Sequence, residues 1–323
     1  MGREGRFGGP LSFWLTGGVP EHADYLEAHR VRRRGQLFIL LAAVAWSTAG
    51  VMQRELTVST TTQLAGRALF AALALAAFVV ILSRGHPLAA FRSIGVAGLA
   101  VAVTTAIASG MFILALNHAN VANVLFLQAA SPVAAALLAW LALGEKISRR
   151  AALAMGIAVL GVGLMVGGPG SGGVLGVGAS VVMTIAFAIS IVITRHRRDV
   201  SMAPAICLSQ VIVFLVVAPF AEPGAATDRD ILWLALLGVG QMGLGLAFLT
   251  MGARLLPSSE VALITLLEVV LGPLWVWISI SEQPAGTAIL GGCVVIAAVV
   301  LQATEKTRAA PAPSPATLPG HAR

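Results

Sequence analysis

The chain of 323 residues is too apolar for an ordinary soluble protein, because 58% of its residues are hydrophobic and only 11% are charged, against about 25% charged in soluble domains. Its formal net charge of +7 could suit a nucleic acid, but the basic residues lie in short clusters between apolar runs, as in the loops of membrane proteins. The composition therefore predicts a protein of the lipid bilayer and argues against a nucleic-acid partner.

Residues 1–34 precede the first long apolar run. They contain no apolar stretch followed by a small-residue cleavage site, so we do not expect a secretory signal. We expect a disordered cytoplasmic tail. For residues 1–29 the alternative is a start codon assigned too far upstream.

Ten segments are long and apolar enough to cross a hydrocarbon core of about 30 Å. They are rich in Ala, Leu and Gly and lack the alternation of barrel strands, so we expect helices. The fold class is therefore predicted to be an all-α integral membrane protein with ten transmembrane helices. The expected spans are residues 35–52, 60–82, 94–116, 119–143, 151–166, 174–194, 202–220, 231–252, 258–280 and 285–303.

The loop charges predict the orientation. With a cytoplasmic amino terminus, the outer loops hold only Arg54 and Arg229. Such an asymmetry follows the positive-inside rule and places both termini in the cytoplasm, as expected for a multi-pass protein of the inner membrane. The fifteen cytoplasmic basic residues are Arg30, Arg32, Arg33, Arg34, Arg84, Arg92, Lys146, Arg149, Arg150, Arg195, Arg197, Arg198, Arg254, Lys306 and Arg308.

The spans form two copies of five. An offset of 137 residues places Glu268 on Ser131, and an offset of 141 places Phe187 on Trp46. Because five is odd, the second copy must enter from the opposite face, which gives the inverted repeats of many secondary transporters. The expected domains are an N-terminal tail at 1–34, a first repeat at 35–168, a second repeat at 169–303 and a Pro- and Ala-rich cytoplasmic tail at 304–323.

Two ionisable residues lie well inside the spans, Arg67 in the second and Glu268 in the ninth. Charges at this depth are costly and usually functional or paired. One hypothesis is that both border a central cavity, where Arg67 attracts a substrate carboxylate and Glu268 handles an amine or a proton. The alternatives are a structural ion pair between two helices, or an Arg67 side chain that reaches outward to the interface.

Ser131 and Pro132 lie near the middle of the fourth span. Proline removes a backbone hydrogen bond, which membranes tolerate where the freed carbonyl faces protein or a wet cavity. Gln128 lies one turn earlier on the same face, and Trp46 sits mid-span in the first helix. We expect these four residues, with Arg67 and Glu268, to line the cavity; a simple packing bend at Pro132 is the alternative.

For the other polar residues within or at the ends of the spans we favour structural or solvated roles. Gln210 and Gln241 lie within spans. Each could bind substrate or join helices by a hydrogen bond, and we favour the second, since polar side chains often serve that purpose in membranes. Glu145, Glu260 and Glu282 lie at span ends, where solvated side chains are the default.

The sequence contains no motif for enzymatic chemistry in the structural context that such a motif requires. Residues 238–243 match the dinucleotide pattern but lie inside an apolar span, where close helix packing explains the glycines. No phosphate-binding loop occurs, and the six histidines lack metal spacing. We therefore expect no catalytic residues, no cofactor and no bound metal.

Several stretches resemble the EamA-type permeases of the drug/metabolite transporter superfamily. They are WSTAG from Trp46, TTQLAGRALFAAL around Arg67, and NVLFLQAASPVAAALLAWLALGEK followed by a basic loop and a Gly-rich helix. The second copy departs from the family pattern, with Glu268-Val269 for Glu-Pro and Ser281-Glu282 for Gly-Glu. The resemblance implies a permease that moves a small metabolite, amino-acid-like or drug-like, outward across the inner membrane without nucleotide hydrolysis.

The expected function is thus a secondary transporter that works by alternating access on a small-molecule substrate, with protons as one candidate coupling ion. The alternative is a non-transporting membrane sensor or assembly partner. The substrate, the direction, the coupling ion and the oligomeric state are left open by the sequence.

Overall fold

The protein is all-helical in the part that the structure, a computed structural model, describes: residues 22–144, 149–165, 172–197, 200–256, 261 and 264–303. The first half contains α2 (His22–Ser47), α3 (Ala49–Arg54), α4 (Thr60–Leu82), α5 (Pro87–Ser93), α6 (Gly95–His118), α7 (Val121–Ala129), α8 (Ser131–Leu143) and α9 (Arg149–Met165). The second half contains α10 (Gly173–His196), α11 (Ala203–Val217), η1 (Ala218–Phe220), η2 (Pro223–Ala225), α12 (Asp228–Ala235), η3 (Leu236–Leu244), α13 (Gly245–Ala253), α15 (Leu267–Ile280) and α16 (Gly286–Ala303).

Seven helices in the described ranges are long and apolar enough to cross a membrane. They occupy the first to fourth and the sixth to eighth of the expected spans. Shorter apolar helices lie at the fifth, ninth and tenth, namely Ala152–Leu164, Leu267–Ile280 and Gly286–Leu301. The chain is therefore an all-α membrane protein with seven long apolar helices and several shorter ones.

The first helix begins earlier than the sequence predicted. A disordered tail was expected up to residue 34, but α2 starts at His22. Residues 22–34 contain neither Gly nor Pro, so the helix of the first span can extend into them without a breaker.

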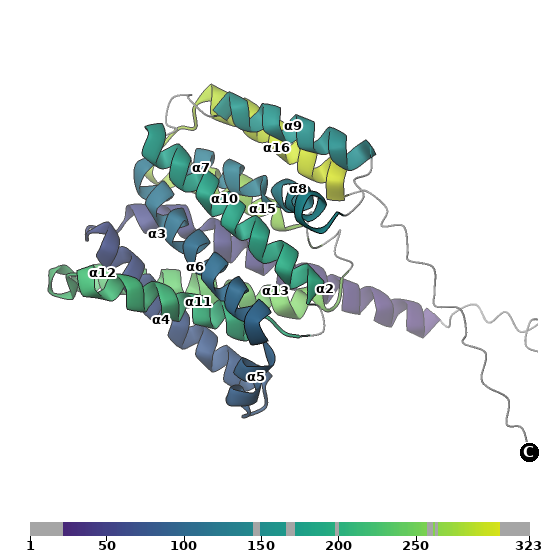
Figure 1. Ribbon diagram of the computed structural model, residues 1–323, viewed down its shortest axis with the longest axis horizontal. Coiled ribbons are helices and arrows are strands. Elements are labelled where there is room, and N and C mark those ends of the chain that lie inside the picture. Colours follow the sequence, from purple (N-terminus) through teal and green to yellow (C-terminus); the bar gives the residue numbers. More distant parts are fainter. Residues whose placement is uncertain are drawn as a thin grey trace, which may run out of the picture.

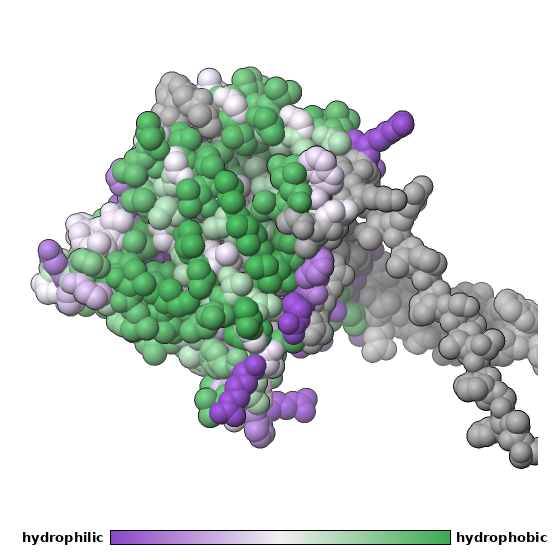
Figure 2. Space-filling model, in the orientation of Figure 1, coloured by the Kyte–Doolittle hydropathy of each residue, from purple (hydrophilic) through white to green (hydrophobic). Residues whose placement is uncertain are grey.

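Large apolar side chains cover the outside of the molecule. Leu73, Ile81 and Val96 are 60%, 75% and 84% exposed, which would be costly in water over so wide an area. Figure 2 shows apolar side chains across one face of the molecule and hydrophilic ones gathered around α5. This surface suits lipid, because hydrocarbon is as apolar as these side chains.

Helices from the two halves pair in a symmetric pattern. α4 packs against α11, α7 against α15, and α9 against α16, and the last pair lies side by side along one edge in Figure 1. Two further pairs are equivalent to each other: α2 of the first span packs against α13 of the eighth, and α6 of the third span packs against α10 of the sixth. Swapping each span for its counterpart five places later reproduces these contacts, so the halves are related in space as well as in sequence.

Several spans are interrupted partway along. α7 and α8 are separated at Ala130, and α15 begins at Leu267 after a turn at Leu266. The starts of α8 and α15 are equivalent to within one residue under the 137-residue offset. The proline follows the break, within the first turn of α8, where its missing N–H removes no helical bond.

The eighth span contains η3, a nine-residue π-helix between α12 and α13. Two of its three glycines pack closely on α4. A Cβ atom on Gly238 would lie 2.5 Å from Cβ of Phe70, and one on Gly243 would lie 2.8 Å from Cβ of Ala74. This close approach accounts for Gly238 and Gly243 of the dinucleotide-like pattern, as the sequence predicted, whereas a Cβ atom on Gly240 would meet nothing within 4 Å.

Candidate functional site

A cavity of about 590 Å³ lies between helices of both halves. Its volume is in the range of small-molecule sites. All six residues expected to border a cavity lie on its wall: Trp46, Arg67, Gln128, Ser131, Pro132 and Glu268. Further polar or charged groups on the wall are Thr105, Ser109, Arg195, Gln241 and Thr265, and the rest is mostly apolar.

The repeat alignment is visible in the cavity wall. Ser131 and Glu268, which align under one offset, both line the cavity, from the first turn of α8 and the first turn of α15. Trp46 and Phe187, which align under the other, line it from α2 and α10. The cavity is therefore built by equivalent positions of the two halves.

Arg67 is buried in the middle of α4, with 3% of its surface exposed. Its Nη1 donates to Oγ of Ser109 at 2.9 Å, and its Nη2 donates to Oε1 of Gln241 at 3.3 Å. The Nε atom has no hydrogen-bond partner among the residues that the structure describes. The guanidinium is thus held between α4, α6 and η3 by neutral oxygens.

Neither structural alternative for Arg67 fits this geometry. No carboxylate in the described part of the chain pairs with it, so it is not one half of an ion pair with Glu268. Nor does the side chain reach outward, because it is buried and lines the cavity. A buried cation that meets only neutral groups retains most of its attraction for an anion.

Gln241 combines two roles that the sequence analysis had separated. It joins helices, as predicted, through its bond from Arg67, and it also lines the cavity. The π-helix η3 places it there, and π segments in membrane and soluble helices often occur at functional sites. Gln210, in contrast, donates to Ser209 at 3.1 Å and to Ser109 at 3.5 Å and is not part of the wall.

No sequence pattern pointed to Ser109 or Thr105 as site residues. Both are short hydroxyl side chains in α6, and such residues are common inside membrane helices. Ser109 accepts from Arg67, while Thr105 shares a 3.0 Å hydrogen bond with Ser190 of α10. Only the packing of α6 on α4 and α10 reveals these partners.

Two half-helices start at the cavity. Ser131 Oγ donates to the backbone oxygen of Gln128 at 2.5 Å across the break between α7 and α8. Glu268 lies in the first turn of α15, half-buried, and within the described residues it has neither a hydrogen bond nor an ion pair. The amino-terminal end of a helix carries partial positive charge, which favours negative groups at both places.

Trp46 is packed against η3 and α13 at the cavity edge. A Cβ atom on Gly245 would lie 2.2 Å from Nε1 of the Trp46 indole. Only glycine leaves room for the ring in this position. The next residue, Ser47, accepts a 3.0 Å hydrogen bond from Nε1 of Trp275, which ties α2 to α15.

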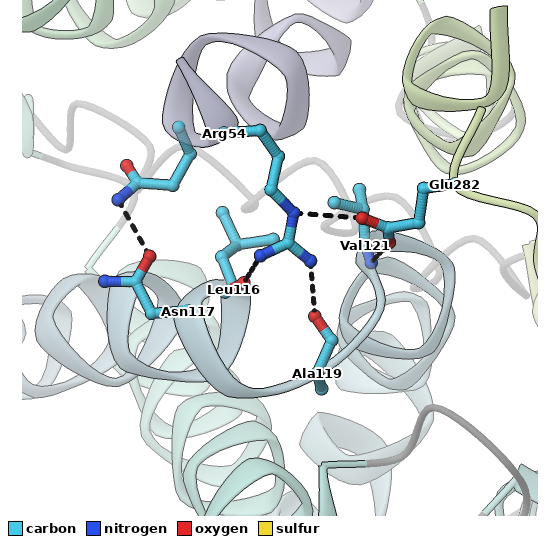
Figure 3. A network of polar contacts seen from close by, with 7 residues as sticks. Arg54, Leu116, Asn117, Ala119, Val121 and Glu282 are labelled. Carbon is cyan, nitrogen blue, oxygen red and sulfur yellow. Dashed lines mark hydrogen bonds and ion pairs between the residues drawn. The ribbon is translucent and has the colours of Figure 1, made fainter. Parts of the chain in front are cut away.

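Glu282 is not the solvated span-end residue that the sequence predicted. Its carboxylate accepts from Nε of Arg54 and from the backbone N–H of Val121, each at 2.9 Å, as Figure 3 shows. Its side chain is 19% exposed. Of the other two carboxylates in that prediction, Glu145 and Glu260 lie outside the described residues.

A protein-family model matches the chain twice, at residues 33–167 and 171–304, and describes the EamA-like transporter family. The chain belongs to the EamA-like transporter family. It therefore contains two EamA domains of the drug/metabolite transporter superfamily. Membership makes this EamA-like protein a multi-pass membrane transporter and not an enzyme.

Solved structures support the fold of this EamA-like protein. One, described only as "Crystal structure of protein", matches with a TM-score of 0.55 and 17% sequence identity, covering 83% of this chain and 96% of the other. At that identity the likeness concerns the fold alone. No curated protein matches the sequence.

Proposed function

We propose that this EamA-like protein is a secondary transporter that moves a small amino-acid-like or drug-like metabolite outward across the inner membrane by alternating access. The observation that carries the proposal is the cavity shared by both halves, with the buried Arg67 on its wall. Glu268 also lines this wall and has no hydrogen-bond or ion-pair partner among the described residues. A site between two related halves can be exposed to either side when they rock.

The proposed topology has ten spans in two inverted five-helix repeats, at 35–168 and 169–303, with both termini in the cytoplasm. The contact of α2 with α13 and the equivalent contact of α10 with α6 support a two-fold relation of the halves. The excess of basic residues in the cytoplasmic loops supports the orientation.

The proposed substrate carries a carboxylate. Arg67 would bind it as a guanidinium, which matches a carboxylate in charge and in shape. Glu268 would bind an amine on the same molecule or carry the coupling proton. The apolar wall that surrounds these groups suits an apolar body on the substrate.

Three probes of nearly the same shape separate these roles in liposomes that contain the purified protein. Leucine carries both charges, 4-methylpentanoate lacks the amine, and 3-methylbutylamine lacks the carboxylate. We expect protein-dependent flux of leucine, weaker flux of 4-methylpentanoate and none of 3-methylbutylamine above the protein-free leak. Each flux is measured with and without a pH gradient.

The outcome discriminates between classes of function. Flux of the amine alone would overturn the role of Arg67 as the carboxylate site. If these probes, labelled nucleobases and cationic drugs all show no protein-dependent flux, the substrate class is wrong. Flux that is unchanged by a pH gradient would remove the proton as coupling ion.

A further inference from the structure

A cluster of hydrogen bonds joins the two halves at one end of the molecule. Arg54, the last residue of α3, donates from Nε to Glu282, from Nη1 to the backbone oxygen of Leu116 at 2.6 Å and from Nη2 to that of Ala119 at 2.9 Å. Figure 3 shows the guanidinium pointing toward all three partners. One side chain thus holds the carboxyl end of α6 and a residue of the second half.

The carboxylate partner continues the link. Glu282 lies just after α15 and accepts from the backbone N–H of Val121, the first residue of α7. That N–H has no partner within its own helix, and a carboxylate at a helix start is favourable. We call Arg54 and Glu282, with the backbone groups that they bind, the clasp.

Two more contacts join the halves at the same end. The backbone N–H and the hydroxyl of Thr57 both donate to the carboxylate of Asp230, at 2.8 Å and at 3.0–3.1 Å. Arg229 pairs with Glu55, and its side chain is 70% exposed. The clasp is therefore part of a layer of polar contacts between the two halves.

This layer lies one helical turn beyond the cavity wall. Leu116 of the clasp follows Phe112 of the cavity wall by one turn of α6, and Gln63 precedes Arg67 by one turn of α4. Gln63 belongs to the same layer, since it accepts from Gln53 at 2.5 Å next to Arg54. Neither Arg54 nor Glu282 lines the cavity.

The cavity extends toward the other end of the molecule. A Cβ atom on Gly172 would lie 2.3 Å from the backbone oxygen of His118, so α10 starts at the clasp end. α10 runs for 24 residues, or about 36 Å, and Arg195 in its last turn is exposed and lines the cavity. The cavity wall thus stops about one helical turn short of the clasp and includes the exposed Arg195 at the far end.

We infer that the clasp between Arg54 and Glu282 is the gate of the transport pathway on the outer side, and that it breaks each time the cavity opens there. The inference rests on the proposed alternating access. It assigns a role in transport to two residues outside the cavity wall.

The chemistry of the clasp suits a contact that must open. The side chains of Arg54 and Glu282 are 25% and 19% exposed, so water can reach both charges as they part. The backbone groups that they bind lie at helix ends, where water can replace the lost partner. Arg67, at 3% exposure, has no such access to solvent and suits a fixed binding group.

Cysteine accessibility tests the gate without any substrate. A cavity-wall reporter, Ala136→Cys, is placed in a background with Cys207→Ala and Cys293→Ala. A membrane-impermeant methanethiosulfonate reagent is then applied to each side of oriented vesicles. Glu282→Gln should raise the labelling rate from the clasp side about five- to tenfold. Arg54→Lys should act in the same direction, because the three acceptors are bound by three different nitrogens of the guanidinium and the single ammonium nitrogen of lysine cannot reach them all.

A matched control comes from the same face. Arg229→Gln removes the ion pair with Glu55, which also joins the two halves but is more exposed. We expect labelling from the clasp side to stay at the parent rate. Equal labelling in the parent, the Glu282→Gln protein and the Arg54→Lys protein would overturn the gate, whatever the outcome of the flux measurements.

Cross-linking the clasp tests whether it must open during transport or is a permanent structural contact. In an Arg54→Cys, Glu282→Cys protein, bifunctional methanethiosulfonate reagents of increasing length are used to join the two positions. Leucine flux should fall to the protein-free leak after cross-linking and return on reduction. Full flux through the cross-linked protein would show that the clasp stays closed during transport and would refute the inference.

Discussion

Gln241 accepts a hydrogen bond from Nη2 of Arg67 at 3.3 Å, and both residues line the same cavity. The amide oxygen occupies one donor of the guanidinium without neutralising its charge. An anion that enters the cavity thus meets a cation whose protein partners are neutral and easily exchanged.

Replacing Gln241 by glutamate should block the anion site at Arg67 with a carboxylate of the protein itself. A carboxylate at this position would form an ion pair with Arg67 and compete with the substrate carboxylate. We expect at least a tenfold loss of leucine flux, equivalent to about 1.4 kcal/mol, with normal insertion. Wild-type flux in Gln241→Glu liposomes would contradict a carboxylate site at Arg67.

The conservative change Arg67→Lys should also impair recognition. Lysine keeps the charge but loses the planar fork that holds a carboxylate and cannot bind Ser109 and Gln241 together in the same geometry. We expect a raised KM for leucine with a smaller change in maximal flux. A control for folding is the thermal unfolding midpoint in detergent, which should fall by only a few degrees.

Glu268→Gln tests the proton-handling role. The amide is nearly the same size but does not titrate, so any pH dependence that arises from this carboxylate should disappear. We expect leucine flux to become flat across the pH range in which the parent varies. If the variant and the parent follow the same pH profile, Glu268 does not carry the coupling proton.

Gly245→Ala tests the position of Trp46. The added methyl group would overlap the indole nitrogen, so the ring must move or η3 and α13 must shift. Such overpacking typically costs about 1–3 kcal/mol, visible as a lower unfolding midpoint. Gly240→Ala is the matched control, because a Cβ atom there meets nothing within 4 Å.

The residue pattern alone determined the membrane class, the positions of the apolar segments and the duplication. These are properties of composition and periodicity, which can be read along the chain without knowing what touches what. Arg67 and Glu268 were found for the same reason, because a charge within an apolar run stands out in one dimension. Ser131, Pro132 and Gln128 were found because proline and amide groups are conspicuous at that depth.

Tertiary structure decided which partners these residues have. Ser109 became a partner of Arg67 only through the packing of α6 on α4, and Gln241 reached the cavity through a π-helix whose backbone register the sequence does not display. Arg54 and Glu282 are 228 residues apart, and each looks like an ordinary loop charge when read alone. Hydrogen bonds of this kind depend on distances between helices, and those distances are set by the packing of the whole bundle.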